Sequence, residues 1–127
     1  MNKPISLVLS LMLLGGLVAG CTSGPPKEYT DANQTIEIGV GEKFIIALES
    51  NPTTGYGWET AFDSSYLEQV DSKYTATQTK SAMVGSGGTQ RFTFEGLKAG
   101  TTEPTLTYKR SWEQDFAKQH TFTVHIK

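Results

Sequence analysis

Apolar residues recur at every second position along most of the chain from residue 35 to its end. The clearest runs are Ile36/Ile38/Val40, Phe44/Ile46/Leu48, Phe92/Phe94 and Phe122/Val124/Ile126. A period of two is typical of a strand that buries one face and exposes the other. The pattern predicts strands at 34–40, 43–50, 56–62, 66–77, 89–96, 102–110 and 119–127. Seven strands, without a helical period long enough for crossover connections, predict an all-β fold: an immunoglobulin-like antiparallel β-sandwich over residues 34–127.

Turn signals separate several of these strands. The runs Gly39-Val40-Gly41 and Lys98-Ala99-Gly100 combine glycine with short connections, which favours tight turns. The boundary between the third and fourth strands is weaker. A short helical turn near 63–67 could replace part of that region.

Three connections carry sequences too specific for ordinary turns: the B–C loop (51–55), the D–E loop (78–88) and the F–G loop (111–118). Pro52 fixes its own φ and pushes Asn51 towards an extended conformation. Gly55 and Gly57 permit positive φ. Alternate connections of a sandwich emerge at the same end, so we expect the three loops to cluster there, with the B–C loop as a stiff projection.

The first twenty residues form a separate block that predicts a signal peptide at 1–20. Lys3 precedes an apolar run at 5–17, and Ala19-Gly20 precede the single cysteine, Cys21. The run is shorter than the ~20 residues that a membrane-spanning helix needs.

The sequence around Cys21 resembles the lipobox of bacterial lipoproteins, whose cysteine carries the lipid. A lipid-anchored protein of the bacterial cell envelope would follow, with residues 21–33 as acylated cysteine and flexible tether. Thr22 lacks the aspartate associated with inner-membrane retention, which favours the outer membrane in a Gram-negative source. The alternative is that Cys21 is an incidental thiol beside an ordinary cleavage site.

Length and charge narrow the functional classes. The chain has 127 residues, a formal charge of −2 and one cysteine. These values indicate a single domain, with no internal disulfide and no basic stripe for nucleic acid. We expect a monomer.

The sequence offers few candidate catalytic or metal-binding residues, so we expect no enzyme, no metal and no cofactor. His120 and His125 point to opposite faces of one predicted strand and are interpreted as structural. Glu113 and Asp115 are expected to be a solvated pair rather than an acid/base dyad. The glycine-rich run at 85–88 precedes a strand instead of a helix, which argues against a phosphate site.

Binding is the remaining class of function. Trp112 and Arg110, placed near a loop apex, are residue types that dominate interface energetics. Taken alone, Trp112 could equally lie in the core.

Together the loops resemble the chagasin family of inhibitors of papain-like cysteine peptidases, whose signatures read Asn-Pro-Thr-Thr-Gly-Tyr, Gly-x-Gly-Gly and Arg-Pro-Trp. The corresponding runs are Asn51-Pro52-Thr53-Thr54-Gly55-Tyr56, Gly85-Ser86-Gly87-Gly88 and Arg110-Ser111-Trp112. Ser111 departs from the family proline, which predicts a looser F–G loop and binding weaker by several-fold.

The resemblance implies reversible, noncovalent blocking of the peptidase cleft. The B–C loop would enter the cleft, with Thr53 and Thr54 nearest the catalytic thiol and imidazole, while the other two loops grip its walls. The implied peptidase-binding residues are Asn51, Pro52, Thr53, Thr54, Gly55, Tyr56, Gly85, Gly87, Gly88, Arg110 and Trp112. The alternative function is an envelope-anchored adhesion or assembly module that holds a non-peptidase partner with the same loops.

Overall fold

A computed structural model describes residues 25–77 and 87–127 of the chain. The predicted signal peptide, Cys21 and Gly85 lie outside the described residues. Within them, no helix is long and apolar enough to cross a membrane.

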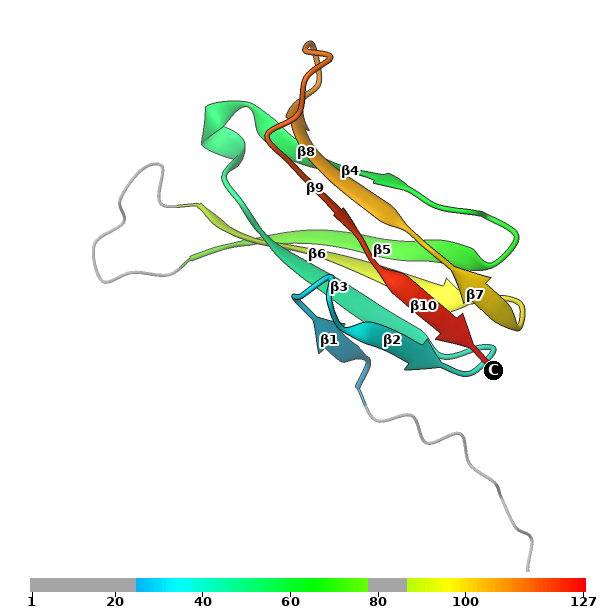
Figure 1. Ribbon diagram of the computed structural model, residues 1–127. Helices are drawn as coiled ribbons and strands as arrows, with labels where there is room; N and C mark the ends of the chain where they lie inside the picture. Colours follow the sequence, from blue (N-terminus) through cyan, green and yellow to red (C-terminus); the bar gives the residue numbers. More distant parts are fainter. Residues whose placement is uncertain (1–24, 78–86) are drawn as a thin grey trace, which may run out of the picture.

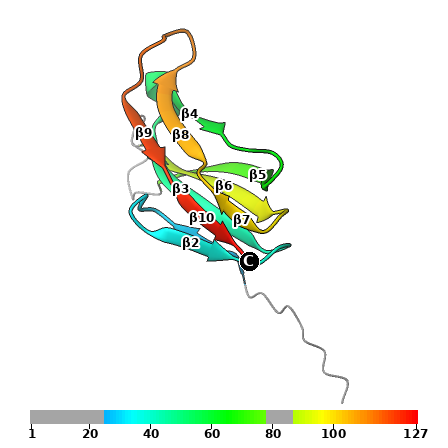
Figure 2. The same cartoon turned by 45° about the vertical axis from the view of Figure 1, so that its right-hand side comes forward.

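The described residues form two β-layers packed face to face (Figures 1 and 2). One layer has the strand order β1-β3-β6-β5, and the other combines β2-β10-β7 with β4-β8-β9. The strands are β1 (Lys27–Tyr29), β2 (Thr35–Ile38), β3 (Lys43–Ser50), β4 (Tyr56–Ala61), β5 (Leu67–Ala76), β6 (Gly88–Gly96), β7 (Gly100–Thr102), β8 (Thr105–Arg110), β9 (Lys118–Thr121) and β10 (Thr123–Ile126). The predicted all-β sandwich is confirmed.

Two predicted strands are each interrupted once, at the same level of the sheet. The strand predicted at 102–110 is divided into β7 and β8 by Glu103 and Pro104, and the strand predicted at 119–127 is divided into β9 and β10 at Phe122. Proline has no N–H to donate to a ladder, but its carbonyl accepts the Phe122 N–H at 2.9 Å. The two halves of the layer therefore stay joined, as Figure 1 shows for the run of β9 into β10.

The prediction that residues 21–33 form a flexible tether is wrong at β1. This strand pairs in parallel with β3, with Lys27 opposite Phe44 and Tyr29 opposite Ile46. Tyr29 is only 7% exposed, and its ring meets that of Phe44 edge-on at 6.4 Å. Three residues are too few to show a hydrophobic period, so the alternation that revealed the other strands was missing here.

The sandwich is antiparallel apart from its two N-terminal strands. Besides β1 with β3, β2 pairs in parallel with β10. Both strands lie at sheet edges, where they add to a partner that is distant in sequence. The other strand pairs are antiparallel, as predicted.

Alternating apolar side chains of both layers fill the core, and these coincide with the period-two positions of the sequence except Val40, which is 53% exposed on the turn after β2. Phe44 stacks on Phe94 at 5.6 Å, and Phe122 and Ile36 are fully buried. The 63–67 connection is a hydrogen-bonded turn, in which the Asp63 carbonyl accepts the N–H groups of both Tyr66 and Leu67. The helical turn considered for that region is present.

The direction of β3 defines two poles of the domain. The start of β3 lies beside β1, while its end at Ser50 leads directly into the B–C loop. Eight strand residues span about 25 Å. The chain therefore enters the domain near the pole opposite the B–C loop, as Figure 1 shows.

We predict that Tyr29→Ala lowers the free energy of unfolding by about 3 kcal/mol, because a buried aromatic ring is lost from the core. Urea denaturation measures the change. Lys27→Ala, in the same strand but exposed, is the control and should stay within about 0.5 kcal/mol of the parent protein. Equal stability of all three proteins would mean that β1 is a passive tether after all.

Candidate functional site

The B–C loop closes on itself in a single turn of 3-10 helix at Pro52–Thr54. The Asn51 side chain accepts from the Thr53 N–H at 3.3 Å, and its carbonyl accepts from the Thr54 N–H at 3.1 Å. Gly55 ends the turn with φ of 83°, a conformation that costs a residue with a Cβ energy. These bonds make the exposed loop a bent projection, as predicted.

Two of the backbone expectations for this loop differ in outcome. Asn51 has φ −132° and ψ 88°, the extended type of conformation that a following proline favours. Gly57, in contrast, does not have a positive φ, because it is a regular β4 residue paired with Lys109. Of these two glycines, Gly55 alone uses the positive φ that glycine permits.

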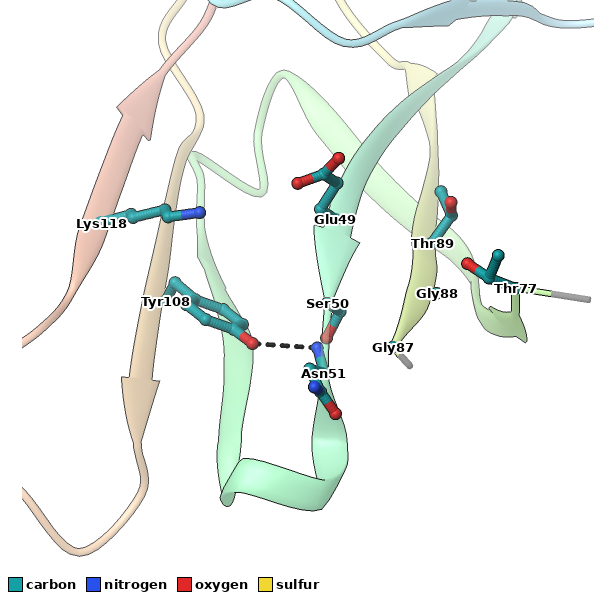
Figure 3. A pocket seen from close by; sticks show the side chains of 9 residues that line it. All are labelled: Glu49, Ser50, Asn51, Thr77, Gly87, Gly88, Thr89, Tyr108 and Lys118. Carbon is teal, nitrogen blue, oxygen red and sulfur yellow. Dashed lines mark hydrogen bonds between the residues drawn. The ribbon is translucent and has the colours of Figure 1, made fainter. Parts of the chain in front are cut away.

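Side chains of the opposite layer hold the base of the B–C loop. The Tyr108 hydroxyl, from β8, accepts the Asn51 N–H at 2.9 Å, the bond drawn in Figure 3. The Trp58 indole N–H, from β4, donates to the Glu49 carbonyl at 2.9 Å. The backbone on both sides of Ser50 is thus fixed by two bonds that cross between layers.

A ladder of rings connects this base to the F–G loop; we call the five stacked residues the aromatic ladder. Its members are Arg110, Tyr56, Tyr108, Trp58 and His120. The Arg110 guanidinium lies 4.5 Å from the Tyr56 ring centre, and successive rings are then 5.3, 4.8 and 5.6 Å apart. Stacking at these distances is favourable beyond the area that it buries.

Both histidines have structural contacts in the described fold. His120 is the last ring of the aromatic ladder, and Nδ1 of His125 lies 2.9 Å from the Thr101 hydroxyl. Among residues 25–77 and 87–127, no three His, Cys, Asp or Glu side chains gather as a metal-binding group.

The F–G loop begins with a turn that is closed by two hydrogen bonds. The Glu113 N–H donates to the Arg110 carbonyl at 3.1 Å, and Arg110 Nη1 donates to Glu113 Oε1 at 2.9 Å. This charge-assisted bond raises the pKa of Arg110 above its ordinary value. The prediction that Glu113 forms a solvated pair with Asp115 is therefore wrong for Glu113, because arginine three residues earlier binds it.

Trp112 lies at the surface and contacts the B–C loop. Its side chain is 70% exposed, which excludes the core position that the sequence left open. The indole covers Gly55, where an added Cβ would lie 2.6 Å from Cη2 of Trp112. Only glycine fits beneath the indole in this arrangement, so the two loops are matched in shape.

The described end of the D–E loop also lies beside the B–C loop. Gly87 has φ of 74°, and a Cβ there would lie 3.1 Å from the Ser50 carbonyl oxygen. A Cβ on Gly88 would overlap the Thr75 carbonyl. Gly87, Gly88 and Tyr108 help to line a polar groove of about 340 Å³ around the end of β3 (Figure 3). The predicted clustering of the three loops is confirmed for their described residues.

Two features of this region were missed by the sequence analysis. The Tyr108 hydroxyl bond joins residues 57 positions apart, and no local pattern reveals it. Phe116 is 53% exposed in the F–G loop. Its place outside any period-two run was a signal that its ring would not be buried by a strand.

Comparison with known proteins identifies the relatives of this fold and these loops. A sequence model of the chagasin family peptidase inhibitors, I42, matches residues 37–126. The chain belongs to the chagasin family. The matched region spans β3 to β10, and therefore includes all three loops.

Individual family members show the same extent of similarity. Chagasin from Trypanosoma cruzi is 36% identical over 100 residues, covering 73% of this chain and 87% of its own length. Amoebiasin-1 from Entamoeba histolytica is 35% identical over 94 residues, with 74% and 89% covered. The crystal structure of the cysteine protease inhibitor EhICP2 from Entamoeba histolytica superposes with a TM-score of 0.71 at 28% identity, covering 80% of this chain and 95% of that one.

We predict that Tyr108→Phe lowers the free energy of unfolding by about 1–2 kcal/mol, because the Asn51 N–H loses this acceptor. Faster amide hydrogen exchange at Asn51 should accompany the loss. Tyr56→Phe is the matched control, because it removes a hydroxyl from the ring that stacks on Tyr108, and this hydroxyl has no hydrogen-bond partner among the described residues. Similar effects of the two substitutions would contradict the role given to the Tyr108 hydroxyl.

Proposed function

We propose that this protein is a reversible, noncovalent inhibitor of papain-like cysteine peptidases, held at the bacterial cell envelope by a lipid on Cys21. Membership of a family of peptidase inhibitors supports the inhibitory activity. The relative EhICP2 is described as a cysteine protease inhibitor, which supports this class of target. The observation that carries the proposal is the convergence of the described loop residues on one pole.

The B–C loop is proposed to occupy the catalytic cleft without being cut. A papain-like peptidase holds its substrate as an extended strand with a carbonyl presented to the thiolate. Residues 52–54 instead form a 3-10 turn. The carbonyls of Asn51, which precedes the turn, and of Pro52 accept hydrogen bonds within the loop. Thr53 and Thr54 are exposed at the tip and would lie nearest the catalytic residues.

The F–G loop is proposed to grip one wall of the cleft through Trp112. An exposed indole offers a large contact area with few rotatable bonds to freeze. Arg110 acts as an internal brace, since its guanidinium is already engaged by Glu113 and Tyr56. Phe116, exposed on the same loop, would add a second apolar contact.

The D–E loop is proposed to approach the other wall with its backbone. Glycines at 85, 87 and 88 would allow a partner to come close to the main chain. At Gly87 the conformation with φ of 74° already requires glycine.

The proposed anchor fits the place at which the chain enters the domain. The chain enters β1 near the pole opposite the B–C loop. A lipid on Cys21, joined through the residues that precede β1, would leave the loops facing away from the membrane. Two or three acyl chains at ~0.8 kcal/mol per CH₂ hold a protein firmly.

Titration of papain with the purified protein tests the proposed activity. We expect stoichiometric loss of turnover at nanomolar enzyme and full recovery of activity after dissociation, with the inhibitor intact. Unchanged papain and cathepsin L activity at micromolar protein would reject the proposal. Capture of envelope structural proteins in place of a peptidase would favour the adhesion alternative.

We predict that Trp112→Ala weakens inhibition about 30-fold, equivalent to ~2 kcal/mol, because a central exposed aromatic is removed. Its melting temperature should stay unchanged. Val40→Ala is the control, because Val40 is an apolar residue, 53% exposed, on the turn after β2 at the opposite pole. Equal inhibition constants for the two variants would exclude Trp112 from the interface.

We predict that Cys21→Ser moves the protein from the membrane fraction to the soluble fraction of the envelope, because the acyl chains have no thiol to join. Cell fractionation and metabolic labelling with a fatty acid measure the change. Retention of the variant in the membrane, or absence of label on the parent protein, would contradict the lipid anchor.

A further inference from the structure

The turn that carries Trp112 lacks the residue that would fix it locally. The Glu113 N–H donates to the Arg110 carbonyl, so Ser111 and Trp112 are the two central residues of a β-turn. The first central position is where proline is favoured, since its ring holds φ near −65°. Serine leaves that φ free. Any further restraint on this turn has to come from another interaction.

The side chains of Arg110 and Glu113 provide such an interaction. They are the first and last residues of the turn, and Arg110 Nη1 donates to Glu113 Oε1 at 2.9 Å. The side-chain bond therefore closes the same four residues that the backbone bond closes. Each of the two side chains is 36% exposed, so solvent screens the pair only in part.

Glu113 also determines where the arginine lies. Arg110 is stacked over Tyr56 at 4.5 Å, and its Nε is buried without a hydrogen-bond partner among the described residues. An unsatisfied buried donor opposes this position. The bond from Nη1 to Glu113 offsets that cost, and without it the guanidinium gains by swinging out to water.

The position of Trp112 follows from the closure of the turn. Trp112 lies between Arg110 and Glu113, and its indole covers Gly55. No hydrogen bond of the Trp112 indole is recorded in the described structure. Opening of the turn would therefore release the indole from the B–C loop.

We propose that Glu113 is a positioning residue that holds Trp112, through Arg110, in the conformation that binds the peptidase. The inference rests on the proposed function for the identity of the partner. Glu113 itself need not touch the target. It raises the fraction of free protein in which the F–G loop is ready to bind, and the apparent affinity scales with that fraction.

Inhibition constants of three variants, compared with the parent protein, test the role. Glu113→Ala should weaken inhibition about two- to five-fold, as expected for a partly exposed ion pair that restricts a loop. Asp115→Ala is the matched control, because it removes a carboxylate of the same loop that has no hydrogen-bond partner among the described residues, and it should stay within two-fold. Ser111→Pro in the Glu113→Ala background should restore inhibition, because proline fixes the turn by another route.

Two outcomes of this experiment would overturn the inference. Equal losses for Asp115→Ala and Glu113→Ala would mean that the target senses only the charge of the loop. A loss for Glu113→Ala that persists beside Ser111→Pro would mean that Glu113 contacts the target directly.

Nuclear magnetic resonance of the free protein separates this inference from the proposed function. The chain has two tryptophans, so two indole N–H signals are expected. The heteronuclear NOE of Trp112 should fall in Glu113→Ala and recover with Ser111→Pro, while Trp58, bonded to Glu49, stays unchanged. Unaltered Trp112 mobility in Glu113→Ala overturns the inference even if inhibition is found. If the parent protein fails to inhibit, the proposed function is rejected, while the measured mobility of Trp112 still tests the role of Glu113.

Discussion

The loop-bearing pole depends on the contact between Tyr108 and the start of the B–C loop. On the side of this contact away from the loops, the apolar core of both layers holds the sandwich together. Beyond Leu48, towards the B–C loop, the residues that face each other across the two layers are polar or aromatic. The hydroxyl of Tyr108 reaches across to the Asn51 N–H, while its ring stacks on Tyr56 and lies tilted against Trp58. One side chain therefore fixes the direction of the B–C loop and links it to the strands that carry the F–G loop.

The loops are held in shape by different means. The B–C loop is fixed mainly by its own backbone, through Pro52, the positive φ of Gly55 and bonds to the Asn51 side chain and carbonyl. The F–G loop is fixed by side chains, through the Arg110 contacts with Glu113 and Tyr56. Backbone restraints hold at any ionic strength, whereas a partly exposed ion pair weakens with salt. The rigidity of the F–G loop is therefore more sensitive to salt concentration than that of the B–C loop.

The sequence predicted most of the fold because a half-buried strand repeats over neighbouring residues, as at Phe44, Ile46 and Leu48. It also predicted which loops meet, because alternate connections of a sandwich share an end. It could not predict β1, which is too short to show a period. It missed the interruption at Pro104, although a proline inside a strand run is a signal for such a break. It also misjudged Glu113, because its bond to Arg110 depends on how the turn closes. Such contacts depend on three-dimensional distances that local patterns do not contain.

The bonds that brace the B–C loop also affect how the molecule meets its neighbours. β1 ends opposite Ile46, so the upper part of β3 continues without a strand on that side. An open edge of this kind offers backbone groups to any other chain in an extended conformation. By alternation, Glu49 and Asn51 direct their backbone groups to that same side, where Trp58 and Tyr108 bind them. Trp58 and Tyr108 thereby occupy two of the backbone groups through which another extended chain could pair with this edge.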